Sequence, residues 1–440
     1  MPVMPSRVPL GRLPVLAVAL ALLALLLPAG GASAATSYDL EARYSVEVVL
    51  DWDTRWVDVR TWIFVRNTSG RTIDRLELNT VAAKLGNMKD LRARADGTSV
   101  PATKVGQTLK VPLGKQLAEG ASARVFVGYR ARLRTSAAGR GYFFAKLNGV
   151  AQLYRFIPWI SRQAPFGNSD HGEQFVTPVS PRVEVTVTAD RKLAWATSGR
   201  RAEKIDARTF RYVATNVRDF NIAASPSWKT TVGRSINGKT KIFVHSRKHD
   251  GKRLLKLARA ELARYRKISS VPYPHDTYRI AETGGGLAME SPAFIWIPAS
   301  RSAADLPYLV SHETAHQWWY SMVGNDQATD AFADEALADY FSRQKHLSIR
   351  ASRCATDRLD RDSQAYSDLC YFEVIYVQGA RFLAKLRKDY GSARFLAAIR
   401  AYTRDNRDEV SNNARLLEAF RAQMGDGVLP RFRSRFPSIY

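Results

Sequence analysis

The segment SHETAHQWWY at 311–320 constrains this 440-residue chain more than any other. It places His312 and His316 four positions apart, with Glu313 directly after the first histidine. A right-handed helix brings residues i and i+4 onto one face, so both imidazoles can reach a single Zn²⁺ at about 2.0–2.1 Å. The spacing therefore predicts a helix here that carries two zinc ligands, with the Glu313 carboxylate beside the metal but not bound to it.

A zinc site that hydrolyses substrates needs a third protein ligand and an open position for water. Glu335, in DAFADEALADY, follows His316 after the intervening residues 317–334. That gap allows the first helix to end, a loop through 324–326 to reverse the chain, and a second helix to return a carboxylate. We predict Glu335 as the third ligand of one Zn²⁺ per chain. Asp339, on the same helix face, either accepts the second ring proton of a ligand histidine or faces solvent.

The charges at such a site indicate hydrolysis. Zinc lowers the pKa of its water towards about 7 and polarises a carbonyl, while Glu313 is placed to take the proton and pass it on. The developing oxyanion also needs a hydrogen-bond donor. Spacing alone leaves Tyr366, Tyr371 and Tyr376 open for that role.

Other conspicuous residues favour structural interpretations. The pair His245 and His249 has the same spacing, but no glutamate follows the first histidine, and a strand-like run leads into a charged loop. We therefore interpret this pair as structural or exposed. Trp318 and Trp319 are predicted to pack in the core rather than to contact substrate.

The first 34 residues have the pattern of an export signal. Arg7 and Arg12 give a positive start, 13–27 is an apolar run, and small residues allow cleavage near Ala34. The run is shorter than the about 20 residues that span a bilayer. We expect a secreted or extracytoplasmic protein, with an uncleaved anchor as the alternative.

The two cysteines fit this compartment. In an exported protein, Cys354 and Cys370 are more consistent with a disulfide than with reactive thiols. Buried free thiols are the alternative, and neither cysteine has other metal-binding residues close to it in the sequence.

The chain is strongly basic, with 66 Lys and Arg against 41 Asp and Glu and a formal net charge of +25. The basic residues are scattered through apolar periodic segments and form no recognised nucleic-acid motif, so no nucleic-acid partner is predicted. We interpret the charge as a solvated basic surface, with electrostatic association with an anionic cell surface as the alternative.

The pattern of apolar residues predicts an α+β multidomain chain, too long for a single core. Residues 35–228 alternate in strand fashion between turn clusters, which indicates a β-rich N-terminal domain. After Trp228, strand-like runs flank a helical segment, and from Leu306 nearly everything has helical spacing. Residues 229–440 are therefore predicted as a second domain, a small mixed sheet plus helices that ends in a short helical cap.

Taken together, these segments resemble the aminopeptidase N family of zinc metallopeptidases, gluzincins in which HExxH precedes a downstream glutamate ligand. The gap between the second histidine and Glu335 has that family's length. GLAMES at 286–291 resembles the family's GAMEN motif, and YVQGA at 376–380 resembles its Tyr-x-Lys-Gly-Ala motif. From about residue 229 onward, the chain matches the family in its motifs and in their order. The β-rich half resembles the family's first domain only in its general strand-rich character. It implies a thermolysin-like catalytic domain.

The resemblance implies the same roles at the metal as the spacing does. His312, His316 and Glu335 would hold zinc, and Glu313 would be the general base. It adds Tyr376 as the group that stabilises the reaction intermediate.

The resemblance also implies a site for the substrate. Glu290 would bind the free α-amino group, with Ala288 and Met289 beside it as substrate-binding residues. A fixed carboxylate close to zinc pairs with an ammonium and sets the cut one residue from the end. The glycine run at 284–286 is either a plain turn or lets the backbone approach a peptide as an edge strand.

The sequence departs from the family pattern in two ways. Leu287, Ser291 and Gln378 stand where the family has glycine, asparagine and lysine, which leaves amine recognition and side-chain preference open. The sequence ends at Tyr440, without the large helical domain that covers the cleft in full-length members. We therefore expect a more open cleft that admits longer peptides.

The expected function is that of an exported zinc aminopeptidase acting on peptides with a free N-terminus. One alternative is a zinc endopeptidase with an open cleft. Another is a non-catalytic cell-surface binding module, which is disfavoured because no ligand and no base has been lost. The sequence does not indicate the preferred N-terminal residue, the physiological peptide or the oligomeric state.

Overall fold

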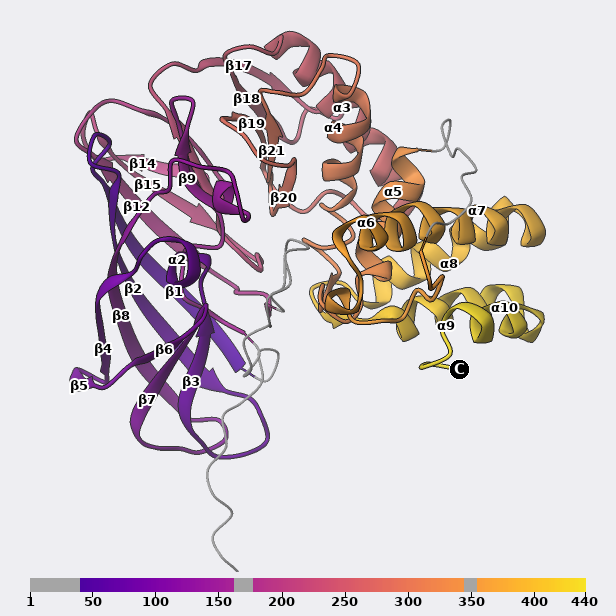
Figure 1. Ribbon diagram of the computed structural model, residues 1–440, viewed down its shortest axis with the longest axis horizontal. Coiled ribbons are helices and arrows are strands. Elements are labelled where there is room, and N and C mark those ends of the chain that lie inside the picture. The colour runs from indigo at the N-terminus through magenta and orange to yellow at the C-terminus, as the bar shows by residue number, and fades with distance from the viewer. Residues whose placement is uncertain (1–39, 162–176, 344–353) are drawn as a thin grey trace, which may run out of the picture.

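The structure is a computed structural model and describes residues 40–161, 177–343 and 354–440. The predicted export signal at 1–34 lies outside the described residues. Strands dominate up to about residue 246, and helices dominate after 306 (Figure 1). This confirms the predicted α+β fold class.

An eight-stranded sheet forms one wall of the N-terminal half. Apolar and polar residues alternate along its long strands, so one face is buried and the other is exposed. In spatial order its strands are β14 (Arg200–Lys204), β15 (Thr209–Ala214), β12 (Val183–Ala189), β1 (Leu40–Leu50), β2 (Trp56–Asn67), β8 (Ser122–Arg132), β4 (Lys89–Ala95) and β5 (Thr98–Val100).

Two four-stranded sheets and two short helices complete this half. One sheet has the order β13 (Ala194–Thr197), β16 (Ile222–Ser225), β10 (Val150–Leu153) and β9 (Phe144–Leu147). The other has the order β11 (Trp159–Ile160), β3 (Ile73–Asn79), β7 (Thr108–Leu117) and β6 (Thr103–Val105). The helices are α2 (Val81–Leu85) and the 3₁₀ turn η2 (Gly141–Phe143).

The second half begins with a five-stranded mixed sheet. Its order is β17 (Lys229–Arg234), β18 (Lys241–Ser246), β19 (Thr277–Thr283), β21 (Phe294–Pro298) and β20 (Met289–Ser291). Helix α3 (Gly251–Ser269) connects β18 to β19, which run parallel, and packs against α4 (Leu306–Ala315). A short parallel pair, β22 (Gly324–Asn325) and β23 (Val410–Ser411), lies within the helical part.

The remaining elements are helical. They are η3 (Phe332–Ala336), α5 (Leu337–Ser342), η4 (Ser363–Ala365), α6 (Asp368–Tyr371), η5 (Phe372–Gln378), α7 (Gly379–Tyr390), α8 (Ser392–Asp405), α9 (Asn413–Met424), η6 (Asp426–Val428) and α10 (Leu429–Arg435). Both η3 and η5 have π-helical geometry. Cys354 and Cys370 form a disulfide, which links the chain before η4 to helix α6. No helix in the described ranges is long and apolar enough to cross a membrane.

The two halves share an apolar boundary at β20 and β21. Met289, Phe294 and Trp296 belong to the core of the N-terminal half, although their neighbours Ile295 and Ile297 belong to the second core. The Trp296 ring meets Tyr154 edge-on, with ring centroids 5.5 Å apart. Strand β20 is thus fixed between both cores, which holds its backbone rigidly beside the end of α4.

Candidate metal centre and substrate pocket

Helix α4 carries the first histidine and ends just before the second. It begins after Asp305, with Pro307 in its first turn, where a missing N–H is tolerated. The helix ends at Ala315, whereas the sequence predicted a longer one. His316 is the C-cap and keeps helical dihedral angles, with φ −63° and ψ −9°, so its imidazole stays on the face of His312.

The early end of α4 has a tertiary cause. The indole of Trp318 donates to the Val271 carbonyl at 3.0 Å, and that of Trp319 donates to the Thr403 hydroxyl at 3.0 Å. Both tryptophans are buried, as predicted from the sequence. Their separate partners on either side of the chain draw it out of the helical path, and the segment continues as turns.

Glu335 reaches the histidines from η3, at the start of the helix that continues as α5. Its π-helical turn is a geometry often found at functional sites. The carboxylate is buried, as are both imidazoles.

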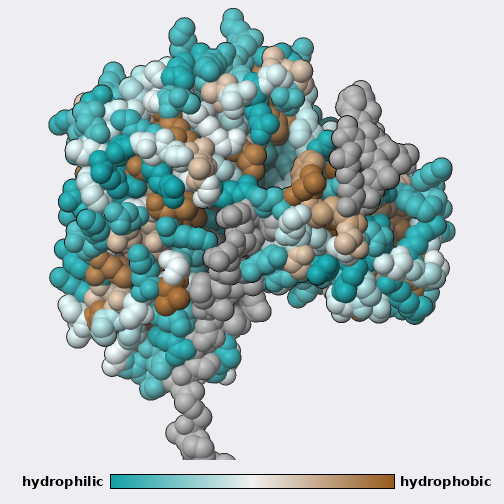
Figure 2. Space-filling view, in the orientation of Figure 1, coloured by the Kyte–Doolittle hydropathy of each residue, from teal (hydrophilic) through white to brown (hydrophobic). Residues whose placement is uncertain are grey.

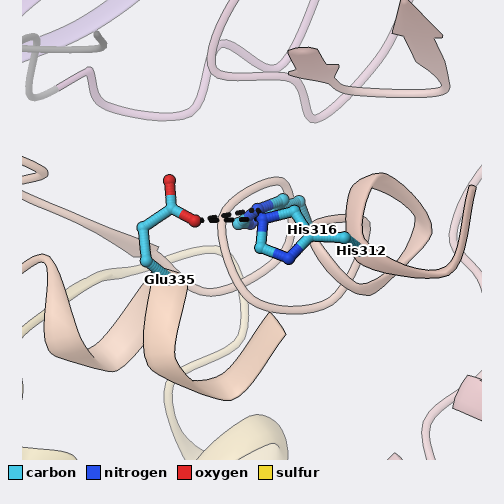
Figure 3. Close-up of side chains that lie close together, drawn as sticks. All are labelled: His312, His316 and Glu335. Atoms are coloured by element: carbon cyan, nitrogen blue, oxygen red, sulfur yellow. Dashed lines mark hydrogen bonds and ion pairs between the residues drawn. The ribbon is translucent and has the colours of Figure 1, made fainter. Parts of the chain in front are cut away.

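The three side chains converge on one point (Figure 3). The Nε2 atoms of His312 and His316 are 3.2 Å apart. Glu335 Oε2 lies 3.2 Å from His312 Nε2 and 3.5 Å from His316 Nε2. A tetrahedral zinc with bonds of about 2.0–2.1 Å sets its ligand atoms about 3.3 Å apart. The donor set and its spacing therefore fit a zinc ion.

A carboxylate that sequence reasoning missed orients the second histidine. Asp334 Oδ1 lies 2.6 Å from His316 Nδ1, and its other oxygen accepts a hydrogen bond from Gln327 Nε2 at 2.9 Å. Such a partner holds the proton on Nδ1 and leaves the Nε2 lone pair for a metal. The signal available in the sequence was the acidic residue directly before Glu335.

Asp339, the residue considered from the sequence, has different partners. Its Oδ1 lies 3.9 Å from His312 Nδ1, beyond hydrogen-bond distance. Instead it accepts from the Tyr308 hydroxyl at 2.6 Å and from Arg343 Nε at 2.7 Å. Asp339 is fully buried, so the solvent-facing alternative is excluded.

Electrostatics at the centre favour a cation. Burial disfavours charge on His316, but Asp334 and Glu335 beside it raise its pKa well above the ordinary value. Burial acts against ionised Glu335, yet the two histidines keep its pKa below the usual range. The Glu335 carboxylate is therefore ionised next to both Nε2 atoms.

We expect Asp334→Asn to weaken zinc binding about 10- to 100-fold, because loss of a partner to a ligand histidine has that effect. An asparagine has one acceptor and cannot serve both His316 Nδ1 and Gln327 Nε2. The zinc dissociation constant, measured by competition with a chelator, tests this. Asp339→Asn is the control, since its carboxylate makes no hydrogen bond to His312 and should cost less affinity. Equal losses in the two variants would contradict the assignment.

A cavity of about 290 Å³ opens beside the three ligands. Figure 2 shows the surface hollowed between the region of β20 and α4 and the region of α6. The other residues predicted from the sequence to act at the site also line this cavity; they are Ala288, Met289, Glu290, Glu313 and Tyr376.

Among the three candidate tyrosines, Tyr376 is the one that lines the cavity. It lies on η5, and its ring stacks on the His312 imidazole with centroids 5.7 Å apart and planes 11° apart. The Tyr366 hydroxyl instead donates to the Arg358 carbonyl at 2.7 Å. Tyr371 does not line the cavity. Of the three tyrosines that spacing left open, only Tyr376 has access to bound substrate.

Glu290 lies on β20, close to the metal ligand His316. Glu290, Glu313 and His316 each offer an atom within 4.8 Å of the others, and all three are buried. Glu290 Oε1 accepts a hydrogen bond from Gln327 Nε2 at 3.1 Å. Gln327 thus contacts both Glu290 and Asp334, and so fixes the cavity's carboxylate relative to the metal centre.

The glycine run before β20 lets this loop approach the N-terminal half. A Cβ on Gly284 would lie 1.8 Å from the Leu147 carbonyl oxygen, and Gly286 has φ +98° against the Tyr142 ring. Only glycine fits such a close approach and such a backbone angle.

A buried arginine from the N-terminal half completes the polar network. Arg155 Nη2 donates to Gln327 Oε1 at 2.7 Å and to the Tyr320 hydroxyl at 2.9 Å. Tyr320 in turn donates to Asp219, and Ser291 donates to the same carboxylate at 2.8 Å. Nothing in the sequence pattern indicated these contacts, which join residues at least 72 positions apart.

The second histidine pair is remote from the cavity. His245 is buried, with Nδ1 3.0 Å from the Thr230 hydroxyl, and His249 Nε2 lies 3.1 Å from the Pro298 carbonyl. Neither lines the cavity.

No protein-family model and no curated protein matches this sequence. Solved structures do match. An M1 zinc metallopeptidase from Deinococcus radiodurans is 18% identical with a TM-score of 0.65, and the match covers 90% of this chain and 94% of that one. A glutamate-to-alanine variant from Deinococcus radiodurans, bound to a Tyr-Ser-Ala substrate, matches with a TM-score of 0.65 at 18% identity over 90% and 93% of the two chains.

A further match is a two-domain M1 zinc metallopeptidase variant bound to L-arginine, with a TM-score of 0.67 and 17% identity over 90% of this chain and 93% of that one. The chain therefore has the fold of two-domain zinc metallopeptidases. In particular it is the M1 fold, which the resemblance to the aminopeptidase N family implied.

Proposed function

We propose that this protein is an exported zinc aminopeptidase that removes N-terminal residues from peptides. The observation that carries the proposal is the convergence of His312, His316 and Glu335, with Glu313 and Glu290 lining the same cavity. Zinc supplies, when bound, a Lewis acid that polarises a carbonyl and activates water. We expect one zinc ion per chain.

Glu313 acts as the general base in this proposal. It sits one residue from His312, faces the cavity, and is not one of the three converging ligands. Its carboxylate takes a proton from the attacking water and later gives it to the leaving amine. Tyr376, stacked beside His312, donates a hydrogen bond to the oxyanion of the tetrahedral intermediate.

Glu290 anchors the substrate's α-ammonium group. A buried carboxylate close to Glu313 and His316 attracts a cation strongly, and its hydrogen bond to Gln327 holds it in place. Ala288 and Met289 precede it along the cavity wall and contact the first side chain. An ammonium bound there fixes the scissile bond one residue away.

Two alternative functions were considered from the sequence, a zinc endopeptidase and a non-catalytic binding module. Glu290 lines the cavity close to Glu313 and His316, and a carboxylate that can bind an α-ammonium group there favours exopeptidase action over an open-cleft endopeptidase. A non-catalytic binding module would have no use for a buried set of three zinc-binding side chains together with a base. Export rests on the N-terminal signal pattern in the sequence.

The amine anchor can be tested with peptides that carry free or acetylated N-termini. We expect cleavage of the free peptide only, and for Glu290→Gln a rise in its KM of about 10- to 100-fold, because hydrogen bonds to charged groups have that strength. Glu418→Gln, on an exposed helical face, is the matched control and should change nothing.

Equal cleavage of both peptides by the native protein would contradict the anchor and favour an endopeptidase. A protein purified without zinc that binds none on addition would favour the module.

A further inference from the structure

The outward face of the eight-stranded sheet forms a groove of about 1360 Å³, far larger than the cavity at the metal centre. Arginines and aromatic rings line it on four adjacent strands. We call it the arginine–aromatic face, and it consists of Arg43 on β1, Arg60, Trp62, Phe64 and Arg66 on β2, Arg124 and Phe126 on β8, and Arg92 and Arg94 on β4.

The strand register interleaves rings and guanidinium groups. Phe64 pairs with Arg43 on one side and Arg124 on the other. The Arg124 guanidinium lies 5.3 Å from the centre of the Phe64 ring. In the next row Phe126 lies between Trp62 and Arg94, with the two ring centroids 5.3 Å apart. Flat apolar surfaces and fixed positive charges thus alternate across the sheet.

The face carries unneutralised positive charge. Arg43 lies 3.7 Å from Glu41, and both side chains are largely solvated. Arg60 lies 3.3 Å from Glu47. The arginines of the face that form no ion pair within the described ranges are Arg66, Arg92, Arg94 and Arg124. Phe64 lies among them and is 42% exposed, so part of its ring is open to a ligand.

We propose that the arginine–aromatic face binds a linear polysaccharide that carries carboxylate groups, such as a uronic-acid glycan. The apolar C–H faces of sugar rings pack on the electron-rich faces of Trp62, Phe64 and Phe126. Arginine pairs with carboxylates through two parallel hydrogen bonds, which suits charges held at intervals along a chain. The site is separate from the metal centre and does not depend on peptidase activity.

The acidic residues in the groove distinguish this ligand from nucleic acid. Glu41, Glu47 and Asp96 line the same groove. These carboxylates repel any polyanion, but they accept hydrogen bonds from sugar hydroxyls, which single-stranded DNA lacks along its length. A polymer that offers free hydroxyl groups beside each carboxylate therefore fits the face better than single-stranded DNA, which otherwise uses similar rings and arginines.

Binding of the full chain to polygalacturonate tests the proposal, with dextran as the neutral comparison and oligothymidylate as a polyanion without free sugar hydroxyls along its chain. We expect Arg94→Ser with Arg124→Ser to weaken polygalacturonate binding about tenfold or more, given the strength of charged hydrogen bonds. Phe64→Ser, which leaves the net charge unchanged, should weaken it about 3- to 10-fold through lost ring contact.

The matched control is Arg253→Ser with Arg259→Ser on the exposed side of α3, which removes the same charge elsewhere. It should leave binding nearly unchanged at physiological salt, because charges beyond a screening length of about 8 Å act weakly. A variant that cleaves peptide at the native rate has kept its fold. If the protein cleaves no peptide, an unchanged thermal unfolding temperature shows the same.

Three outcomes would overturn the proposal. The first is equal loss in both double variants, which would show binding to net charge alone. The second is polygalacturonate binding no tighter than dextran binding. The third is tighter binding of oligothymidylate that is lost in the face variants, which would assign the face to nucleic acid.

Discussion

Glu313→Gln should lower turnover of a cleavable peptide by about 10²- to 10⁴-fold, the usual contribution of a general base. Glutamine keeps the size of the side chain but cannot take a proton from water. The carboxylate is not one of the three converging ligands, so the zinc content should remain that of the native protein. Initial rates and metal analysis on the same preparation test both statements.

The paired readouts separate chemistry from folding. Glu418→Gln, on the protein surface, makes the same chemical change away from the cavity and should keep full turnover. If Glu313→Gln were fully active, another group would have to be the base. If it lost its zinc, Glu313 would belong among the ligands.

Glu335→Ala is expected to lose the metal and with it all zinc-dependent cleavage. The substitution removes a carboxylate that lies within 3.5 Å of both histidine Nε2 atoms. Two imidazoles alone leave zinc short of the three protein ligands that catalytic sites use. Zinc content after dialysis should fall from about one per chain to nearly none.

This second prediction also has a structural readout. The carboxylates of Asp334 and Glu335 both raise the pKa of His316, and removing Glu335 leaves the larger contribution, that of Asp334, in place. The fold should persist, since Glu335 lies at the edge of a cavity, and circular dichroism can verify this. Retention of tightly bound zinc in a folded Glu335→Ala protein would show that another residue completes the site.

The parts of the site that the sequence predicted are those fixed by local geometry. Helical spacing puts His312 and His316 on one face, and a short connection limits where Glu335 can return. Tyr376 and Glu290 were reached only through resemblance, because spacing alone does not choose among three tyrosines or single out one glutamate on a strand. The order of a β-rich half followed by a helical half was predicted from the change in the spacing of apolar residues, from strand-like alternation to helical periodicity.

The parts that the sequence did not predict depend on long-range packing. The end of α4 at Ala315 follows from the separate hydrogen bonds of Trp318 and Trp319. The pairing of Asp334 with His316 depends on the π-helical turn, whereas regular helical periodicity had drawn attention to Asp339. Such features arise from tertiary contacts that no local pattern encodes.

The Arg155 side chain makes the site a joint product of both halves. It comes from the β-rich half, yet it holds Gln327, which in turn holds the Glu290 and Asp334 carboxylates. Chimeras that exchange the β-rich half between distant relatives should therefore alter substrate preference and metal retention, although the three zinc-binding side chains, Glu313 and Glu290 would be inherited intact. In such a protein, substitutions in the β-rich half can change substrate selectivity during evolution without any change in the zinc-binding residues.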